Sequence, residues 1–290
     1  MENKGIEPLK LALPKGRMQD GVLSLLADAG IALTNTARSY RPQISLANCE
    51  VKQLKPQNVV EMLHVGSRDI GFAGADWVAE LGVEVVELLN TELNPVEIVL
   101  AAPPALLDGG ELPPRRLLLA TEYVRLTSDW IDARGRTDQV LRTYGATEVF
   151  PPEDADAIVD NSATGSTLAA NGLQIVDRLM RSSTRLYANP RALDNPTKRQ
   201  RIEDLKLLLC AVLDARRRVM LEVNVSKDRL DEVLTTLPCM RQPTIASLAN
   251  DAGFAVKVAI PRAQLADTVP RVRAAGGTDI VITRPEQIIA

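Results

Sequence analysis

Short apolar runs and stretches of helical spacing alternate along most of the chain. Leu9–Pro14 predicts a buried strand, and the apolar residues of 18–29 recur at helical spacing until Gly30 ends the pattern. A second helix is predicted at 59–63, and residues 68–77 predict a strand that enters a Gly-rich turn. Further buried strands are predicted at 83–89, 96–102, 117–120 and 157–159. This alternation is typical of an α/β fold.

The last third of the chain has a different order of elements. Asn195 and Pro196 fit the cap and the first position of a long helix that leads to a separate C-terminal unit. The basic stretches 198–201 and 216–218 are expected on a solvated surface. From Val219 the order is strand, helix, strand, strand, helix, strand, which predicts a split, ferredoxin-like domain suited to binding or regulation.

The composition is that of an ordinary globular protein. Hydrophobic residues make up 46% of the 290 residues, and 34 basic against 37 acidic residues give a net charge of -3. With 3% aromatic residues, the chain lacks the basic surface and the stacking rings of a nucleic-acid-binding protein. No secretory leader and no membrane span is predicted, so we expect a cytoplasmic protein.

The few cysteine and histidine residues exclude several kinds of site. Cys49, Cys210 and Cys239 are far apart and form no C-x-x-C pair, which argues against a disulfide framework or a thiolate metal site and predicts reduced thiols. A His-rich metal site is excluded because His64 is the only histidine. Its place after an amphipathic stretch favours a partly exposed residue at a helix end over a catalytic one.

The stretch 154–173 carries the clearest chemical signal. A predicted strand ends at Asp160, small and hydroxyl residues follow at 162–167, and Leu168 begins a short helical segment. Small residues let backbone N–H groups approach a phosphate, and a helix N-terminus adds positive potential. The loop is therefore typical of a monophosphate site, and an ordinary turn between a strand and a helix is the alternative.

Charged residues near this loop indicate the rest of the ligand. Asp156 and Asp160 would repel a phosphate, and suit instead a ribose diol, Mg²⁺ or a sugar carbon that gains positive charge. Lys15 and Arg17 follow the first strand, at the sheet edge where ligands of open α/β folds collect, and suit an anion. For this cationic pair, two solvated charges in a turn are the alternative. Together these groups fit a ligand with ribose hydroxyls and a 5-phosphate, such as phosphoribosyl diphosphate.

Four stretches occur in the order and at the spacing of one known family. They are LKLALPKGRM, RDIGFAGADW, GATEVFPPEDADAIVDNSATGSTLAANGL and LPCMRQPTIASL. Over nearly its whole length the chain thus resembles the long form of the ATP phosphoribosyltransferase family, the feedback-inhibited first enzyme of histidine biosynthesis. The resemblance implies a bilobed catalytic part of the type II periplasmic-binding-protein kind. It also implies that the C-terminal unit is an ACT-like, ferredoxin-like regulatory domain that binds histidine.

The implied domains are lobe I (1–97 and 185–217), lobe II with the phosphoribosyl diphosphate loop (98–184), and the regulatory domain (218–290). The implied reaction transfers the phosphoribosyl group to N1 of ATP and releases diphosphate, with Mg²⁺ as cofactor and histidine as inhibitor. Because adenine N1 has a free lone pair, a chain with one histidine can catalyse this reaction by holding its substrates and stabilising charge. A dimer or hexamer of identical chains is also implied.

The resemblance assigns roles by position. Asp160 would hold the ribose hydroxyls, with Asp156 as a second candidate acid. Lys15, Arg17 and Asp76 would lie near the diphosphate, metal or nucleotide, and Glu148 would lie beside the cleft. The residues that would bind the 5-phosphate are Ser162, Ala163, Thr164, Gly165, Ser166 and Thr167.

Two further assignments rest on the same resemblance. Many family members have an Arg-Asp-Ile-Pro segment where this chain reads LKPQNVVEML, and Lys55 is the nearest cation to it. Thr244 and Ser247, near the PTIASL turn, are candidates for the histidine site.

Two other functions remain open. A non-catalytic small-molecule sensor on the same bilobed fold would need the cleft, but not both the acidic pair and the cationic turn. A phosphoribosyltransferase with another acceptor would share the whole site. Inhibition by histidine would distinguish these possibilities, because it is expected only if the product enters histidine synthesis.

Overall fold

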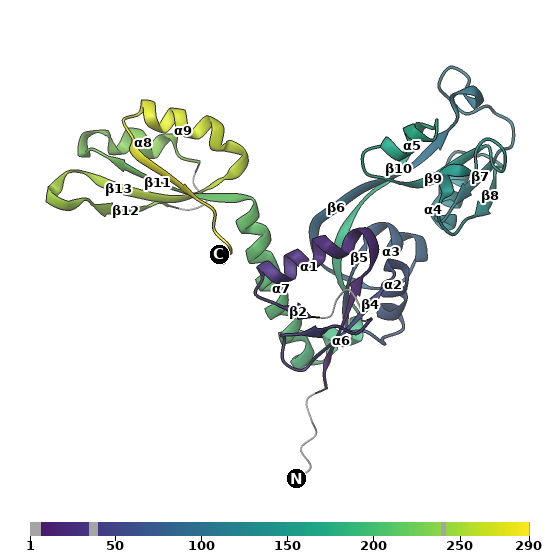
Figure 1. Cartoon of the computed structure of the whole chain (residues 1–290), viewed down its shortest axis with the longest axis horizontal. Helices are drawn as coiled ribbons and strands as arrows, with labels where there is room; N and C mark the ends of the chain where they lie inside the picture. Colours follow the sequence, from purple (N-terminus) through teal and green to yellow (C-terminus); the bar gives the residue numbers. More distant parts are fainter. Residues whose placement is uncertain (1–6, 35–39, 239–241, 290) are drawn as a thin grey trace, which may run out of the picture. The chain divides into compact units, whose positions relative to one another are not determined.

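The computed structural model describes residues 7–34, 40–238 and 242–289. These residues form two compact units. The first consists of the chain up to Ser24 together with Ile31–Ile202, and the second of Leu25–Gly30 together with Glu203–Ala290. Two of the boundaries between the units fall inside the helices α1 (Gln19–Asp28) and α7 (Pro196–Arg216), which Figure 1 labels, and the third follows Gly30.

The first unit is built on an eight-stranded mixed sheet. Three parallel strands lie at each end, with β1 in the middle of one set and β7 in the middle of the other. We call the β1 set with its helices lobe I, and the β7 set with its helices lobe II. The strands are β1 (Leu9–Pro14), β4 (Cys49–Leu54) and β5 (Ile70–Gly74) in lobe I, and β7 (Leu118–Thr121), β8 (Gln139–Arg142) and β9 (Ala157–Ser162) in lobe II.

The helices of the two lobes are short. Lobe I carries α2 (Pro56–His64), α3 (Ala75–Leu81) and α6 (Pro190–Asp194), together with a two-stranded ribbon of β2 (Leu33–Thr34) and β3 (Gln43–Ile44). Lobe II carries α4 (Val124–Ala133) and α5 (Ser166–Ala170). Within the described residues, no helix has both the length and the apolar character that a membrane span needs.

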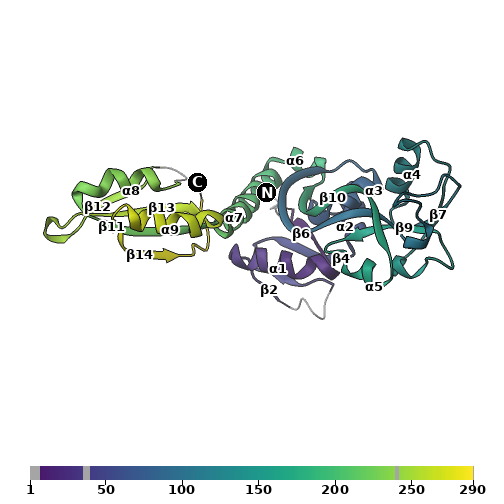
Figure 2. The same ribbon diagram turned by 90° about the horizontal axis from the view of Figure 1, so that it is seen from above.

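Two long antiparallel strands connect the lobes. β6 (Val86–Ala102) and β10 (Gln174–Ala188) pair along their lengths and run from lobe I into lobe II, as Figures 1 and 2 show. β10 also pairs with β5, and β6 with β9, so the sheet order is β4-β1-β5-β10-β6-β9-β7-β8. The predicted lobe boundaries at 97/98 and 184/185 fall inside these two strands and stay predictions.

Each lobe has a hydrophobic core of its own. In lobe I the core includes Val59 and Leu63 of α2 packed beside Tyr187 of β10. In lobe II it includes Leu100 of β6 and Leu119 of β7. The predicted α/β fold with two lobes is therefore confirmed for the first unit.

The second unit contains the predicted β-α-β-β-α-β order. Its strands are arranged β12-β13-β11-β14, and every neighbouring pair is antiparallel, which is a ferredoxin-like sheet. Alternate residues of β11, such as Val219 and Leu221, are buried with Val233 and Val272 of the two helices, which lie on one side of the sheet in Figure 1. The bounds are β11 (Arg218–Val225), α8 (Leu230–Thr236), β12 (Thr244–Ser247), β13 (Phe254–Pro261), α9 (Leu265–Ala274) and β14 (Thr278–Thr283).

Several sequence-based expectations about single residues are met. Asn195 caps α7, because its Oδ1 atom accepts hydrogen bonds from the backbone N–H groups of Thr197 and Lys198 at 3.0 and 3.1 Å. His64 is the last residue of α2 and is exposed. Cys49 and Cys210 are free thiols, and Cys239 lies outside the described residues.

The strand predictions around β6 and β10 need correction. The sequence predicts two strands at 83–89 and 96–102, but the structure has the single strand β6. Polar residues between the two apolar runs hide its continuity, and positive φ angles at Glu92 (58°) and Asn94 (49°) accompany shifts in the pairing with β10. β10 itself is not predicted, because charged residues such as Asp177 and Arg181 leave no long apolar run.

The expectation of a solvated basic stretch at 198–201 is wrong for Lys198. Only 9% of its side chain is exposed, and its Nζ atom lies 3.0 Å from Asp69 Oδ1 and 3.0 Å from Glu7 Oε1. The other carboxylate oxygen of Asp69 accepts the backbone N–H of Lys10 at 2.8 Å. Lys198 therefore joins the start of α7 to the sheet of lobe I rather than facing water.

Candidate active site

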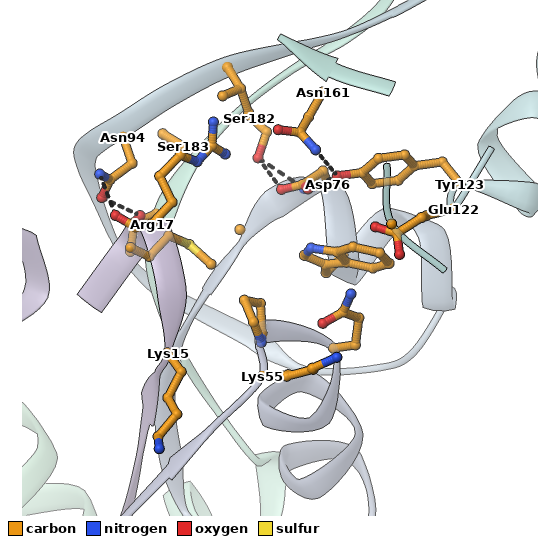
Figure 3. A pocket seen from close by; sticks show the side chains of 18 of the residues that line it. Lys15, Arg17, Lys55, Asp76, Asn94, Glu122, Tyr123, Asn161, Ser182 and Ser183 are labelled. Atoms are coloured by element: carbon orange, nitrogen blue, oxygen red, sulfur yellow. Dashed lines mark hydrogen bonds between the residues drawn. The ribbon is translucent and has the colours of Figure 1, made fainter. Parts of the chain in front are cut away.

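A polar cleft of about 500 Å³ is lined by residues of both lobes and of the strands that join them. We call it the main cleft. Figure 3 shows Arg17 and Asn94 on one side of it and Glu122 and Tyr123 on the other, with Asp76 and Ser182 between them. Its lining contains three cations (Lys15, Arg17 and Lys55), two carboxylates (Asp76 and Glu122) and three aromatic rings (Trp77, Tyr123 and Tyr144).

A second hollow of about 340 Å³ surrounds residues 162–167, which we call the phosphate loop. Glu148 and Asp160 also line this loop hollow. Arg17 and Asn161 line both the loop hollow and the main cleft, so the two spaces adjoin. One extended ligand could therefore place its ends in different spaces.

The phosphate loop has a compact turn. Gly165 has a φ of +78°, a left-handed conformation that glycine adopts without steric cost, and it directly precedes α5. The Ser162 hydroxyl accepts the N–H of Gly165 at 3.0 Å, and the hydroxyls of Thr164 and Ser166 lie 2.9 Å apart. The first N–H groups of a helix have no partner within it, so the start of α5 leaves donors available to an anion.

Asp160 faces the loop hollow from within β9, which continues to Ser162 rather than ending at Asp160. Burial raises the pKa of this carboxyl to about 6, and the nearby carboxylates of Glu122 and Glu148 add to the increase. The backbone N–H of Asn161, which donates to Asp160 Oδ1 at 2.6 Å, and the charge of Arg17 oppose it. Asp160 is thus an oriented carboxylate in a crowded anionic environment.

Asp76 occupies the floor of the main cleft, where both its carboxylate oxygens are already hydrogen-bonded. The Ser182 hydroxyl donates to Oδ1 at 2.5 Å, and the Tyr123 hydroxyl donates to Oδ2 at 2.8 Å. The side-chain amide of Asn161 donates to the Tyr123 oxygen at 3.3 Å and to Asp160 Oδ1 at 3.0 Å. A hydrogen-bonded chain therefore runs from Ser182 through Asp76 and Tyr123 to Asn161, as Figure 3 shows, and Asn161 extends it to Asp160.

Helix α3 also contacts the beginning of α4, and we call this contact the α3–α4 clasp. Glu80 accepts the backbone N–H groups of Arg125 and Leu126, each at 3.0 Å, and so caps α4 from the other lobe. One turn earlier, Trp77 stacks on Tyr123 with 4.8 Å between the ring centroids. The clasp holds lobe I against lobe II beside the main cleft.

Most of the sequence-predicted site residues are brought together. Arg17 lines both spaces, Lys55 lines the main cleft at the start of α2, and Glu148 lines the loop hollow from the 3-10 helix Thr147–Val149. Lys15 also lines the main cleft, but its Nζ atom lies 3.5 Å from the centre of the Tyr40 ring. Figure 3 shows the Lys15 side chain directed away from Asp76.

Asp156 does not join this group. It precedes β9, at the end of the strand opposite to the phosphate loop, and it lines neither the main cleft nor the loop hollow. Its Oδ1 atom is 2.7 Å from Arg115, and its Oδ2 atom accepts the N–H of Leu118 at 2.8 Å. Hydrogen bonding to Arg115 holds the pKa of Asp156 below its ordinary value. Both oxygens are therefore engaged in joining β7 to β9.

Sequence reasoning missed Glu122, Tyr123, Asn161 and Ser182. The first two belong to the triplet Thr-Glu-Tyr, which follows the apolar run of β7. Because β7 is parallel to β9, their carboxyl ends meet at one edge of the sheet. Polar residues after β7 could therefore have been predicted beside the phosphate loop, whereas Ser182 lies in the unpredicted strand β10.

The described residues contain no cluster of three or more acidic, cysteine or histidine side chains with the geometry of a metal site. Glu148 and Asp160 nevertheless supply oxygen donors beside the phosphate loop. Mg²⁺ is commonly held by one or two carboxylates together with substrate phosphates and water, so these donors fit a metal that arrives with a phosphorylated ligand.

The fold and the site define a class of protein: a bilobed α/β protein with a hydroxyl-rich loop beside a polar cleft that contains three cations. A family model described as ATP phosphoribosyltransferase matches residues 55–210, and a second, described as the HisG C-terminal domain, matches residues 215–286. The chain belongs to the ATP phosphoribosyltransferase family, as its sequence stretches predict, and it is an enzyme of the transferase class with the family's C-terminal domain.

Relatives support this assignment over most of the chain. The ATP phosphoribosyltransferase of Pelotomaculum thermopropionicum is 38% identical over 280 residues, covering 94% of this chain and 96% of the relative. That of Chlorobium luteolum is 36% identical over 284 residues, covering 94% of each chain. A solved structure of the ATP phosphoribosyl transferase (HisG:HisZ) complex from Thermotoga maritima has a TM-score of 0.61 at 26% identity, covering 69% of this chain and 98% of that chain.

The α3–α4 clasp predicts a measurable loss of stability. Glu80→Ala removes the acceptor for two N–H groups of α4, so the free energy of unfolding should fall by about 0.5–2 kcal/mol in urea denaturation. The control is Asp129→Ala, which removes an exposed carboxylate of α4 that lies 3.9 Å from Arg125. It should lower the free energy of unfolding by less than about 1 kcal/mol. Equal effects of the two substitutions would contradict the capping role of Glu80.

Proposed function

We propose that this chain transfers the phosphoribosyl group of phosphoribosyl diphosphate to N1 of ATP, releasing diphosphate, in the first step of histidine biosynthesis. Its membership of the ATP phosphoribosyltransferase family supports this reaction. The observation that carries the proposal is the junction of the two spaces, where the phosphate loop, the Asp160 carboxylate and the Arg17 cation meet around one opening.

The substrates divide between the two adjoining spaces. The 5-phosphate binds to the hydroxyls and N–H groups of the phosphate loop, and the ribose hydroxyls lie near Asp160. ATP and the diphosphate group occupy the main cleft, where Arg17, Lys15 and Lys55 balance their negative charge. All three cations line the main cleft, and of the three only Arg17 also lines the loop hollow. This distribution agrees with placing ATP and the diphosphate group in the main cleft.

The residues around the sugar stabilise charge and transfer no proton. The lone pair of adenine N1 forms a bond to C1 of the ribose while the bond from C1 to diphosphate breaks and its electron pair leaves with the diphosphate. The sugar then gains positive charge, and the ionised Asp160 carboxylate stabilises it. Arg17 stabilises the negative charge on the leaving group. The residues that hold the two substrates in line account for the remaining acceleration.

Mg²⁺ is the proposed cofactor. When bound, it neutralises charge on the leaving diphosphate. Glu148 and Asp160 would hold it, and its charge would offset the repulsion between their carboxylates, which contributes to the raised pKa of Asp160. Asp76 is a weaker candidate because Ser182 and Tyr123 already donate to its oxygens.

Absorbance-monitored formation of phosphoribosyl-ATP tests both the reaction and the role of Asp160. The wild-type protein should form product from ATP, phosphoribosyl diphosphate and Mg²⁺, and Asp160→Asn should lower kcat by about 10²–10³-fold because the sugar loses its stabilising charge. Asp132→Asn, an exposed substitution in lobe II, should leave kcat unchanged. If the protein binds phosphoribosyl diphosphate but forms no product, another acceptor or a sensor role is indicated.

The same pair of proteins gives a pH signature. The pKa of Asp160 is raised to about 6, so its ionised form is lost at higher pH than for an ordinary aspartate. Wild-type kcat/KM should therefore fall as pH decreases through about 6, in addition to the titration of the substrate phosphates. Asp160→Asn should retain only the substrate titration. Identical profiles would contradict the catalytic assignment.

The second unit is proposed to bind histidine and inhibit the enzyme, within a cytoplasmic homo-oligomer that is a dimer or a hexamer. Thr244 and Ser247, at the two ends of the edge strand β12, are exposed and available to an effector. The match of residues 215–286 to the family's C-terminal domain supports a shared function of this unit.

Histidine titrations of the activity test this site. Thr244→Ala and Ser247→Ala should each raise the half-inhibiting histidine concentration by up to about tenfold, the effect of one lost hydrogen bond, without changing the uninhibited rate. Thr283→Ala, on the opposite edge strand β14, is the matched control and should leave inhibition unchanged. Unchanged inhibition in all three variants would place the effector elsewhere.

A further inference from the structure

Glu122 is a carboxylate in the main cleft with no assigned part in the phosphoribosyl transfer. It follows β7 and is half-buried, and Figure 3 shows its side chain in the cleft lining, opposite Arg17 and Asn94. Within the described part of the chain, its carboxylate makes no hydrogen bond and no ion pair. Only the charges of Lys55 and Arg142 act on it favourably.

The backbone on both sides of Glu122 is fixed. The Thr121 hydroxyl donates to the carbonyl oxygen of Val159 at 2.7 Å and accepts the N–H of Tyr123 at 2.8 Å. Tyr123 is in turn held by Asp76 and by the Trp77 ring. Glu122 therefore projects from a rigid part of lobe II, which is the kind of support that a group acting on a substrate requires.

The charged form of Glu122 is disfavoured by burial more than it is favoured by Lys55 and Arg142. Burial raises the pKa of Glu122, and its charge contributes to the raised pKa of Asp160. In a cleft that binds two phosphorylated substrates, a further carboxylate repels both. It must therefore face a group that carries or gains positive charge during the reaction.

Two groups gain positive charge in the proposed reaction, the sugar and the adenine ring. Asp160 lies beside the phosphate loop, where the sugar is bound, whereas Glu122 lines the main cleft and not the loop hollow. The rings of Trp77 and Tyr144 line the same cleft, and Tyr144, which is exposed, offers a face on which a base can stack. Glu122 thus lies on the side of the cleft assigned to the base, and Arg17 lies on the opposite side. An in-line displacement requires the nucleophile and the leaving group to be on opposite sides of the sugar, which agrees with the base near Glu122 and the diphosphate near Arg17.

We propose that Glu122 is a catalytic residue that accepts a hydrogen bond from the 6-amino group of the ATP adenine and stabilises the positive charge created when N1 attacks the sugar. This inference rests on the proposed transfer to ATP. As N1 shares its lone pair with C1, the positive charge spreads over N1, C6 and the 6-amino nitrogen. The proton stays on that nitrogen, and the electron pair of the broken C1–O bond leaves with diphosphate.

Steady-state kinetics provide the first test. Glu122→Gln keeps the size of the side chain and removes its charge, so kcat should fall by about 10²-fold while the affinity for phosphoribosyl diphosphate is unchanged. Glu153→Gln, an exposed substitution in the same lobe, should have no effect. An unchanged kcat in Glu122→Gln would overturn the inference, whereas absence of product from the wild-type protein would instead overturn the proposed function.

A binding measurement separates a charge-stabilising role from a structural one. 1-Methyl-ATP has a cationic ring at neutral pH and so imitates the alkylated base without requiring turnover. By calorimetric titration, the wild-type protein should prefer 1-methyl-ATP over ATP, and Glu122→Gln should lose at least about tenfold of this preference. Equal preference in the two proteins, or restoration of Glu122→Gln activity by excess Mg²⁺, would show that Glu122 serves another purpose.

Discussion

The antiparallel pairing of β6 with β10 is the constraint on which the rest of the catalytic unit depends. The pairing joins Val86 to Ala188 in lobe I and Ala102 to Gln174 in lobe II. Because β5 adds to β10 and β9 adds to β6, the same two strands fix where the ends of β5 and β9 face each other. Asp76 and the phosphate loop follow those ends, so the register of one strand pair sets the geometry of the site. Irregular pairing in the middle of β6 and β10 bends the connection between the lobes.

The site built on this frame separates charges of opposite sign by position. The hydrogen-bonded chain from Ser182 through Asp76 and Tyr123 to Asn161 orients Asp160 and leaves it buried among other carboxylates. Cations lie mainly in the main cleft, and the hydroxyl-rich loop lies beside it. Such an arrangement does not need a strong base. It suits a reaction whose transition state separates a cationic sugar from an anionic leaving group, and such a reaction is compatible with a chain whose one histidine is exposed.

Patterns that depend on local sequence were predictable, and those that depend on distant pairing were not. The apolar run of β1, the Asn195 cap and the strand order of the second unit follow from local periodicity and chemistry. β10 was not predicted because it connects the lobes, where many of its positions are partly exposed and charged, so its sequence has no long apolar run. Lys198 was misplaced because its partner Asp69 is distant in sequence. Asp156 was grouped with Asp160 because the two are four residues apart, but Asp156 precedes β9 and Asp160 lies toward its other end, beside the phosphate loop. Glu122 and Tyr123 follow a predicted strand, but their place in the site depends on the pairing of β7 with β9.

In the proposed reaction, the ribose of phosphoribosyl diphosphate lies at the junction of the phosphate loop, Asp160 and Arg17. The most direct measurement is a crystal structure of the full chain with phosphoribosyl diphosphate bound. We expect the 5-phosphate to contact the loop N–H groups, the ribose hydroxyls to lie within hydrogen-bond distance of Asp160, and the diphosphate to extend toward Arg17. A 5-phosphate bound outside the loop, or a ribose remote from Asp160, would contradict this placement.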